Sequence, residues 1–305
     1  MDMSKVVVVT GGNGFIGSHL VRELLNQKYK PILLLRKTAN LDKLKNLNSI
    51  KIGETSDYLN NNTINKLQLF SPLSFIHCAW SGVLGKDRNN NAQKNNVALS
   101  ISSVKLAKKI GCRKWIGLGS HAEYGPQKVK THESIICKPT TLYGKYKLEA
   151  GKKCLELSHK LQLEGKWIRI FSTYGPFDND SWLIPYIIKS LLKNKKPELT
   201  HCEQIWDYLH VEDAVNAIIK LKNSSGRGIF NLGSSKPRKL KEYVSIICDE
   251  INKNIKPSFG KIPYRKDQVM SLYPDITRIK KAAKWNPKID FSNGIKNLVN
   301  YYHEH

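Results

Sequence analysis

The feature that most constrains this chain is a glycine-rich loop directly after an apolar run near its start. Val6–Val9 is a continuous β-branched segment of the kind buried on both faces of a parallel sheet. It leads into Thr10-Gly-Gly-Asn-Gly-Phe-Ile-Gly17 and then into a helical pattern. In this context Gly11 allows a tight turn, Gly14 lets backbone N–H groups approach a pyrophosphate, and Gly17 lets helix and strand pack closely. The stretch therefore predicts a dinucleotide-binding unit with the phosphates at the helix N-terminus.

The end of the second predicted strand, Pro31–Arg36, bears on which dinucleotide is bound. A fold of this kind that prefers NAD usually offers a carboxylate there to the ribose 2′-hydroxyl. This chain offers Arg36 and Lys37 instead, and two cations suit a 2′-phosphate. We therefore favour NADP(H) over NAD(H). The alternative is that both side chains only border a surface loop.

Strand and helix patterns alternate through the first part of the chain. Six such alternations predict an α/β fold with a doubly wound parallel sheet, the Rossmann arrangement. Later strands are expected at Ile50–Gly53, Phe75–Ala79, Arg113–Leu118 and Lys166–Phe171, and a helix at Asn90–Ile110. His77, inside an apolar strand, is expected to be a satisfied core histidine rather than a ligand.

After Pro176 the alternation breaks into helices and short strands without an evident sheet of their own. Helices are expected at 181–192, 211–221, 240–252 and 293–302, and a strand at 228–232. We expect residues 1–175, with 205–233 returning to them, to form the dinucleotide-binding domain. Residues 176–204 and 234–305 would form a smaller C-terminal α/β lobe that binds the substrate.

Tyr143 and Lys147 stand four residues apart, so on a helix they share one face. A phenol ionises near pH 10, and a neighbouring ammonium lowers that pKa. In a cleft the pair would serve proton transfer. Ser120, at the carboxyl end of a predicted strand, can donate a hydrogen bond to a substrate oxygen and to a tyrosine hydroxyl.

Composition and charge bear on whether the chain could be a nucleic-acid-binding, membrane or secreted protein. The 305 residues carry a net charge of +25, which can mark a nucleic-acid surface. However, only nine of the 50 basic residues are Arg, and the lysines are spread along the chain among many asparagines. Such a bias toward Lys and Asn more often reflects the coding composition than a binding surface. No apolar run is long enough to span a membrane, and the start reads as a first strand rather than a signal peptide. The six scattered cysteines indicate reduced thiols and a cytoplasmic protein.

Together these motifs resemble the extended short-chain dehydrogenase/reductase family, the NAD-dependent epimerases, dehydratases and reductases of sugar nucleotides. The resemblance runs nearly end to end, and it is specific for the fold and for nicotinamide chemistry but much less so for the sugar. Its markers are Gly11–Gly17, Ser120-x-x-x-Tyr124-Gly125, Tyr143-x-x-x-Lys147, Arg169 with Tyr174-Gly-Pro176, Asp207–Asp213, Trp285-Asn-Pro287 and Phe291–Gly294.

The resemblance implies a role for each matching position. Tyr143 would be the general acid/base on the sugar oxygen, Lys147 would lower its pKa and hold the nicotinamide ribose, and Ser120 would bind the same oxygen. The implied cofactor contacts are Gly11, Asn13, Gly14, Phe15, Ile16, Gly17, Arg36, Lys37, Ala79, Asn96, Tyr143, Lys147 and Ser172. The expected substrate contacts are Trp80, Ser120, His121, Tyr143, Arg265 and Arg278. A homodimer through the Tyr143 helix and its neighbour is implied, and no metal is expected.

Departures from the family pattern narrow the reaction. The 4,6-dehydratases carry an acidic pair just after the Ser/Thr, where this chain has His121 and Ala122. The GDP-fucose synthase type uses a cysteine where Ala122 stands. The 4-epimerases normally end the second strand in Asp, and here Arg36 and Lys37 follow instead. An exchangeable NADPH suits these two cations better than a tightly held NAD.

A further departure concerns the diphosphate. Trp206 stands where many members place an Arg before the Asp207 segment. Arg265 or Arg278 is therefore expected to supply that contact.

The resulting hypothesis is NADPH-dependent reduction of the C4 ketone of a nucleotide-linked 4-keto-6-deoxy sugar, with Tyr143 as general acid. The alternative within the class is an NAD(P)-dependent sugar-nucleotide 4-epimerase. The alternative of another class is a non-catalytic nucleotide-sensing or RNA-binding protein on the same fold. That alternative would use the charge of +25 but gives no reason for an intact Ser120, Tyr143 and Lys147 set. We therefore expect a nucleotide-sugar substrate and no nucleic-acid or membrane partner.

Overall fold

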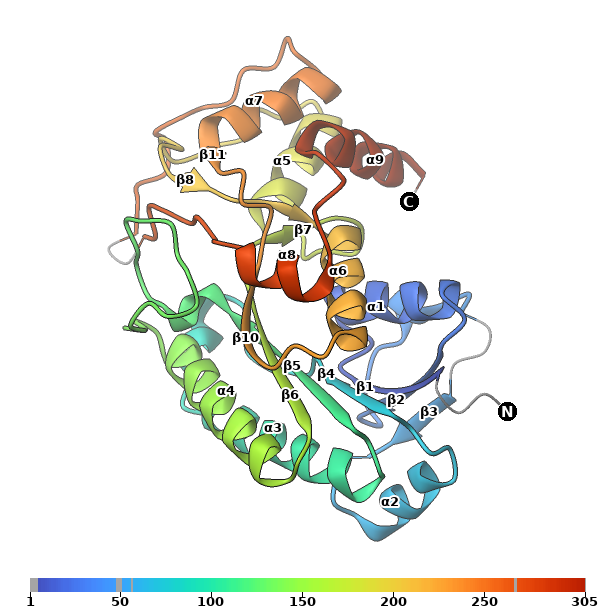
Figure 1. The fold of residues 1–305 in the computed structure, drawn as a ribbon. Coiled ribbons are helices and arrows are strands. Elements are labelled where there is room, and N and C mark those ends of the chain that lie inside the picture. Colours follow the sequence, from blue (N-terminus) through green and yellow to red (C-terminus); the bar gives the residue numbers. More distant parts are fainter. Residues whose placement is uncertain (1–4, 48–50, 56, 266–267, 305) are drawn as a thin grey trace.

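A parallel sheet forms the centre of the molecule (Figure 1). The computed structural model describes residues 5–47, 51–55, 57–265 and 268–304. Within them the main sheet has seven strands in the order β10-β6-β5-β4-β1-β2-β3, and each neighbouring pair is parallel. The order reverses between β1 and β4, and ligands of such sheets bind in the crevice at that reversal. The strands are β1 (Val6–Thr10), β2 (Lys30–Leu35), β3 (Lys51–Glu54), β4 (Ser74–His77), β5 (Lys114–Ser120), β6 (Glu164–Ile170) and β10 (Gly228–Leu232).

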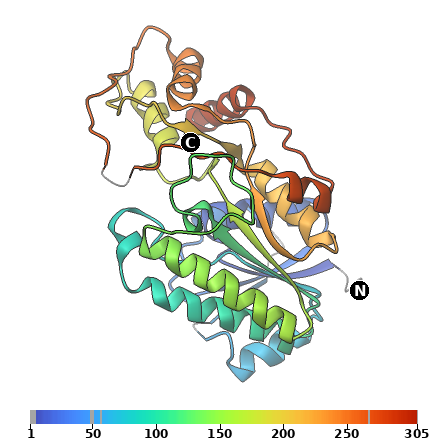
Figure 2. The ribbon, with the colours of Figure 1, turned by 60° about the vertical axis from the view of Figure 1, so that its left-hand side comes forward.

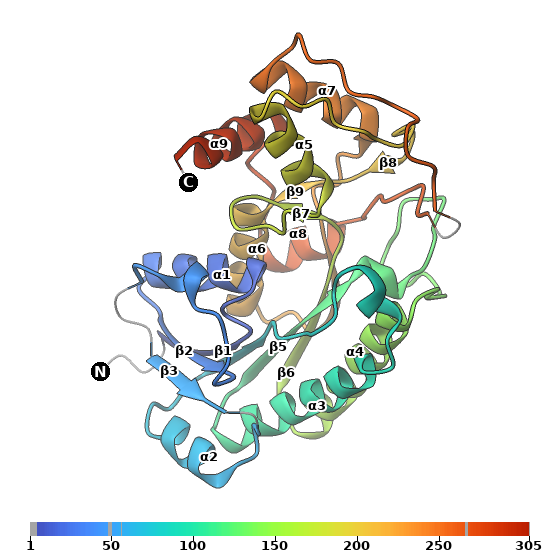
Figure 3. The same cartoon turned by 180° about the vertical axis from the view of Figure 1, so that it is seen from behind.

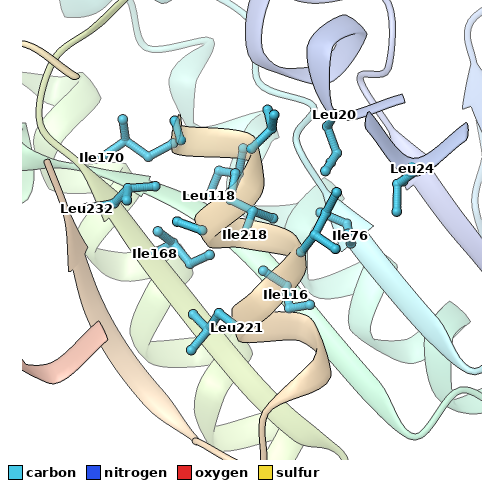
Figure 4. Close-up of a cluster of buried hydrophobic side chains, with 14 of the residues drawn as sticks. Leu20, Leu24, Ile76, Ile116, Leu118, Ile168, Ile170, Ile218, Leu221 and Leu232 are labelled. Carbon is cyan, nitrogen blue, oxygen red and sulfur yellow. The ribbon is translucent and has the colours of Figure 1, made fainter. Parts of the chain in front are cut away.

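Helices cover both faces of this sheet because alternate side chains of its strands point to opposite sides. Val7 and Val9 of β1 enter one core with α1 and α6, shown in Figure 4, where α6 crosses Ile116, Ile168 and their neighbours. Val6 and Val8 enter a second core with α2, α3 and α4. Figure 2 shows α3 and α4 side by side on that second face. The helices are α1 (Phe15–Asn26), α2 (Asn61–Gln68), α3 (Gln93–Lys109), α4 (Leu142–Lys160) and α6 (Val211–Asn223).

A smaller lobe lies beyond the carboxyl ends of β5 and β6 (Figures 1 and 3). Its core is built from α5 (Leu183–Leu192), α7 (Leu240–Ile251) and α9 (Phe291–Glu304). Two short two-stranded sheets join it to the main body. They pair β7 (Thr173–Tyr174) with β9 (Leu209–His210), and β8 (Ile205–Trp206) with β11 (Arg238–Lys239).

The structure differs from the sequence-based expectation in two places. α8 (Thr277–Ala283) does not belong to the lobe, because Ile279 and Ala283 pack into the α1 and α6 core of the sheet. The lobe does hold a small sheet, since β11 pairs antiparallel with β8. Ile50, which we placed at the start of the third strand, lies outside the described residues, so its place in that strand stays a prediction.

No helix among the described residues is long and apolar enough to cross a membrane.

Candidate active site

The glycine-rich loop ends β1 and begins α1. Gly11 has φ of +67°, and a Cβ there would lie 2.6 Å from the backbone N of Ala79, at the end of β4. A Cβ on Gly17 would overlap the carbonyl oxygen of Gly11. Gly14 is the N-cap of α1, no side chain caps it, and the first turn of α1 has no acidic residue. The open helix N-terminus and the tight glycine turn therefore fit a pyrophosphate, as the sequence predicts.

The turn after β2 lies next to this loop. Asn13 donates from Nδ2 to the carbonyl oxygen of Asn40 at 3.1 Å. The turn itself closes with a hydrogen bond from Ala39 N to Arg36 O at 2.9 Å. Arg36 and Lys37 are both exposed on it. The two cations are thus available beside the adenosine end of the predicted cofactor site.

His77 is a core histidine, as expected. Its Nδ1 lies 2.8 Å from Thr10 Oγ1 and its Nε2 lies 3.1 Å from Ser100 Oγ, so both ring nitrogens have partners. Burial, and secondarily the charge of Lys147, lowers the pKa of His77 to about 3. The ring therefore stays neutral and links β1, β4 and α3.

Two side-chain amides of α3 form hydrogen bonds with the loop after β4. Asn96 accepts from Ser81 N at 3.0 Å and donates to Ser81 O at 3.1 Å, so it holds the loop backbone. Gln93 accepts from Trp80 Nε1 at 2.7 Å and donates to Asp87 O at 2.9 Å. The structure thus gives Asn96 a clear positioning role near the predicted cofactor site.

Ser120 ends β5 and begins the short 3-10 helix η4 (His121–Glu123). Its Oγ accepts from Ala122 N at 3.2 Å, and its backbone N donates to Glu123 Oε1 at 2.8 Å. Glu123 is fully buried and also accepts from Trp167 Nε1 at 2.9 Å and from Arg169 Nε at 2.6 Å. A buried ion pair therefore fixes the turn that carries the Ser120 hydroxyl.

Tyr143 and Lys147 lie on the first turns of α4, both buried and facing β5. Thr141 caps this helix by accepting from Gly144 N at 3.1 Å. Lys147 Nζ donates to Leu118 O at 2.7 Å and lies 3.8 Å from the centre of the Trp80 ring. Burial lowers the pKa of Lys147 to about 7, an effect that Glu123 opposes.

The acidity of Tyr143 is a correction to the expectation. Burial raises the pKa of this phenol above its usual value, while hydrogen bonding to Ser120 and the charge of Arg88 oppose the rise. The ammonium of Lys147 lies 5.9 Å from the centre of the Tyr143 ring and is directed to Trp80 and Leu118 O. The free protein therefore does not show the acidification of Tyr143 by Lys147 that the motif implies.

The other side of the site is formed by η4, the residues after β6, and β8. His121 Nδ1 lies 2.8 Å from Phe171 O, and burial lowers the pKa of His121 to about 4. Its ring meets the ring of Trp206 edge to face at 6.5 Å. Trp206 in turn donates from Nε1 to Ser172 Oγ at 3.3 Å. Trp206 therefore places an aromatic ring beside His121 and Ser172, where the resemblance implies an Arg.

Of the two arginines expected at the diphosphate, Arg278 lies apart from this group. Arg278 donates from Nη2 to Arg227 O at 2.9 Å and lies 5.0 Å from the centre of the Phe230 ring. Arg227 precedes β10, so Arg278 sits at the amino end of the sheet, opposite the site, and its expected substrate contact is wrong. Arg265 is exposed on the lobe loop between α7 and α8.

Arg88 is a site residue that sequence reasoning missed. It lies on the 3-10 helix η3 (Gly85–Asn89), and its guanidinium carbon is 4.4 Å from the centre of the Tyr143 ring. The one available signal was its place in the loop after β4, at the carboxyl edge of the sheet. No group of His, Cys, Asp and Glu suited to a metal ion occurs among the described residues.

Comparison with known proteins decides the family. The NAD dependent epimerase/dehydratase family matches residues 7–233, which is most of the chain. The chain belongs to this family. All three residues Ser120, Tyr143 and Lys147 fall within the matched part.

Relatives of this family cover nearly the whole chain. A putative UDP-glucose 4-epimerase of Methanocaldococcus jannaschii is 27% identical over 97% of this chain and 98% of its own. The CDP-abequose synthase of Salmonella muenchen is 23% identical, with 98% of each chain covered. Among solved structures, the UDP-glucuronic acid 4-epimerase of Bacillus cereus, in complex with UDP-glucuronic acid and NAD, has a TM-score of 0.84 at 20% identity, covering 98% of this chain and 99% of that chain. This likeness confirms the Rossmann-like α/β fold.

Proposed function

We propose that the protein reduces the C4 ketone of a nucleotide-linked 4-keto-6-deoxy sugar with NADPH. One observation carries the proposal. Ser120, Tyr143 and Lys147 gather at the carboxyl edge of β5, beside the glycine loop, while His121 and Ala122 fill the positions that follow Ser120. An alanine cannot abstract or donate a proton, and the pKa of His121 is lowered to about 4. Tyr143 is therefore left as the proton donor.

The residues divide the work as follows. When bound, a reduced nicotinamide supplies hydride to a ketone carbon. Because burial raises its pKa, Tyr143 is protonated at neutral pH and ready to donate to the ketone oxygen. The hydroxyl of Ser120, a residue whose backbone N–H donates to Glu123, binds the same oxygen. Lys147 supplies a cation and a hydrogen-bond donor on the cofactor side of the helix.

The cofactor assignment rests on two parts of the chain. The glycine turn fits a dinucleotide, because a Cβ on Gly11 would clash with the backbone of Ala79 and one on Gly17 with the backbone of Gly11, so only glycine allows this tight turn. The exposed Arg36 and Lys37 favour a 2′-phosphate and hence NADP(H). The family as a whole is described as NAD dependent, so the preference for NADP(H) is specific to this proposal.

A 4-epimerase with retained cofactor is the second candidate. It is favoured by the name of the relative from Methanocaldococcus jannaschii, a putative UDP-glucose 4-epimerase. An epimerase oxidises and then reduces the same carbon, so it consumes no NADPH. The two candidates therefore differ in stoichiometry.

A substrate panel tests the proposal. CDP-, dTDP-, GDP- and UDP-linked 4-keto-6-deoxy sugars are each mixed with enzyme and NADPH, and absorbance at the NADPH band is followed. We expect oxidation of one NADPH per sugar with at least one nucleotide. In parallel, the enzyme without added cofactor is mixed with the four nucleotide hexoses. Appearance of C4 epimers there, with no NADPH oxidation in the panel, would replace the reductase by the epimerase.

A further inference from the structure

Arg88 places a permanent positive charge on the face of the proposed proton donor. Its guanidinium carbon lies 4.4 Å from the centre of the Tyr143 ring, whereas Lys147 Nζ lies 5.9 Å from it. A guanidinium stays protonated at every working pH, while burial brings the pKa of Lys147 down to about 7. Above neutral pH, Arg88 is thus closer to this ring than Lys147 and, unlike Lys147, stays fully charged.

The segment that carries Arg88 is fastened to the start of the catalytic helix. Asn89 Oδ1 accepts from Leu142 N at 3.1 Å, so the neighbour of Arg88 is bonded to the neighbour of Tyr143. On the other side, Gln93 holds Asp87 O at 2.9 Å. A hydrogen bond between Asn89 and Leu142 therefore joins the two segments that carry Arg88 and Tyr143, one residue away from each of these side chains.

None of the other polar or titratable groups named here supplies such a positive charge close to the Tyr143 ring. Glu123, on η4, raises the pKa of Tyr143 and is already paired with Arg169 at 2.6 Å. His121, also on η4, is neutral because its pKa is lowered to about 4. Ser120, at the end of β5, is an uncharged hydrogen-bond partner. Lys147, on the same helix, is directed to Leu118 O at 2.7 Å.

We propose that Arg88 sets the acidity of Tyr143, a task that the Tyr-x-x-x-Lys motif assigns to Lys147. A cation over the ring attracts the phenolate more strongly than the neutral phenol, so it favours ionisation. Arg88 acts on the substrate only through Tyr143 and is a positioning residue. The effect of Arg88 on turnover rests on the proposed function, but its effect on the pKa of the Tyr143 phenol can be measured without any substrate.

The direct test is a titration of Tyr143 alone. A fluorotyrosine, which ionises at lower pH than tyrosine, is incorporated at position 143 of the full chain and followed by ¹⁹F NMR. We expect Arg88→Met and Arg88→Gln to move the midpoint upward by about one pH unit or more, a tenfold weaker acid. Arg88→Lys should keep most of the wild-type value. Lys86→Met, which removes an exposed charge from the same 3-10 helix, is the matched control and should leave the midpoint in place.

Two results overturn the inference. One is an unchanged midpoint in both neutral Arg88 variants. The other is an equal shift in Lys86→Met, which would show a general effect of loop charge. Two neutral substitutions are used so that poor folding of one does not end the test.

The pH profile of turnover provides the second readout. A general acid must be protonated, so ketone reduction falls as pH rises through the pKa of Tyr143. Removing the Arg88 charge should move that fall to higher pH by the same amount, with Arg88→Lys restoring it. If wild-type enzyme turns over no nucleotide sugar, the proposed function fails, while the NMR titration still decides the role of Arg88.

Discussion

Glu123 is the buried charge on which the position of Ser120 depends. It is fully buried, pairs with Arg169 at 2.6 Å and accepts from the backbone of Ser120. Removing one partner of a buried pair leaves an uncompensated charge, so Glu123→Ala should lower the free energy of unfolding by about 3–5 kcal/mol. Urea denaturation measures this change.

Two variants control this experiment. Glu156→Ala removes an exposed carboxylate from α4 and should change stability by no more than about 0.5 kcal/mol. The double variant Glu123→Ala with Arg169→Met leaves no unpaired charge and should recover part of the loss. A double variant as unstable as the sum of the two single losses would refute the ion-pair explanation.

At the level of single residues, the sequence predicted which side chains meet but not how they point. Ser120, Tyr143 and Lys147 were predicted because a four-residue spacing and a strand end place them. The direction of the Lys147 ammonium depends on Trp80, which lies far away in the chain. Arg88 was missed for the same reason, since its contact with Tyr143 joins η3 to α4, two elements that only the folded chain brings together.

The turn after β2 is the element that the cofactor preference depends on. Replacing Arg36 and Lys37 by Ala removes the two exposed cations offered to a 2′-phosphate. The Kd for NADPH should rise at least about tenfold, equal to ~1.4 kcal/mol, while that for NADH stays nearly unchanged. Fluorescence titration with both nucleotides measures this difference.

The matched control removes two other exposed lysines, Lys108 and Lys109, at the far end of α3. That double alanine variant should bind NADPH as the wild type does. If both double variants lose affinity equally, the effect is one of net charge. If neither does, NADPH is not recognised through this turn.

Most elements could be predicted because local pattern and tertiary context agree. The apolar run, the glycine turn and the helix that follows all indicate one βα unit, and the strand at Gly228–Leu232 has the expected bounds. α8 was assigned to the wrong domain because it follows the lobe helix α7 in sequence. Its apolar side chains instead complete the sheet core, which sequence order does not reveal. Arg278 was misplaced with it.

At the scale of the whole molecule, buried histidines should make stability depend on pH. Burial lowers the pKa of His19, His121 and His210 to about 4 and that of His77 to about 3. The unfolded chain, with ordinary values near 6.5, then binds more protons between about pH 4 and 6.5. Each histidine contributes a slope of up to ~1.4 kcal/mol per pH unit, and stability falls as pH falls.

Buried carboxyl groups oppose this trend, because burial also raises the pKa of Asp207 and of Glu212. Burial raises the pKa of Asp178 to about 7, so the folded state holds a proton there and gains stability on acidification. We expect the four histidines to outweigh these carboxyl groups, so that the free energy of unfolding is lower by about 2 kcal/mol or more at pH 5 than at pH 7. Urea unfolding at both values measures this. Equal or greater stability at pH 5 would contradict the assignment of neutral buried histidines.

Two expectations about the whole molecule stay predictions. The homodimer through α3 and α4 is one, since these helices lie side by side on one face of the sheet. The absence of a nucleic-acid partner is the other, in spite of the net charge of +25. Gel-shift assays with RNA at low salt test the second directly, because charge-driven binding is strongest there.

The central claim is that Tyr143 donates the proton to the sugar oxygen. The most direct measurement compares wild-type and Tyr143→Phe enzyme in single-turnover reduction of the same nucleotide-linked 4-keto sugar, with the Kd for NADPH measured alongside. General acid catalysis contributes about 10²–10⁴-fold, so the variant should lose that much rate while binding NADPH as before. A rate within about twofold of wild type would contradict the claim.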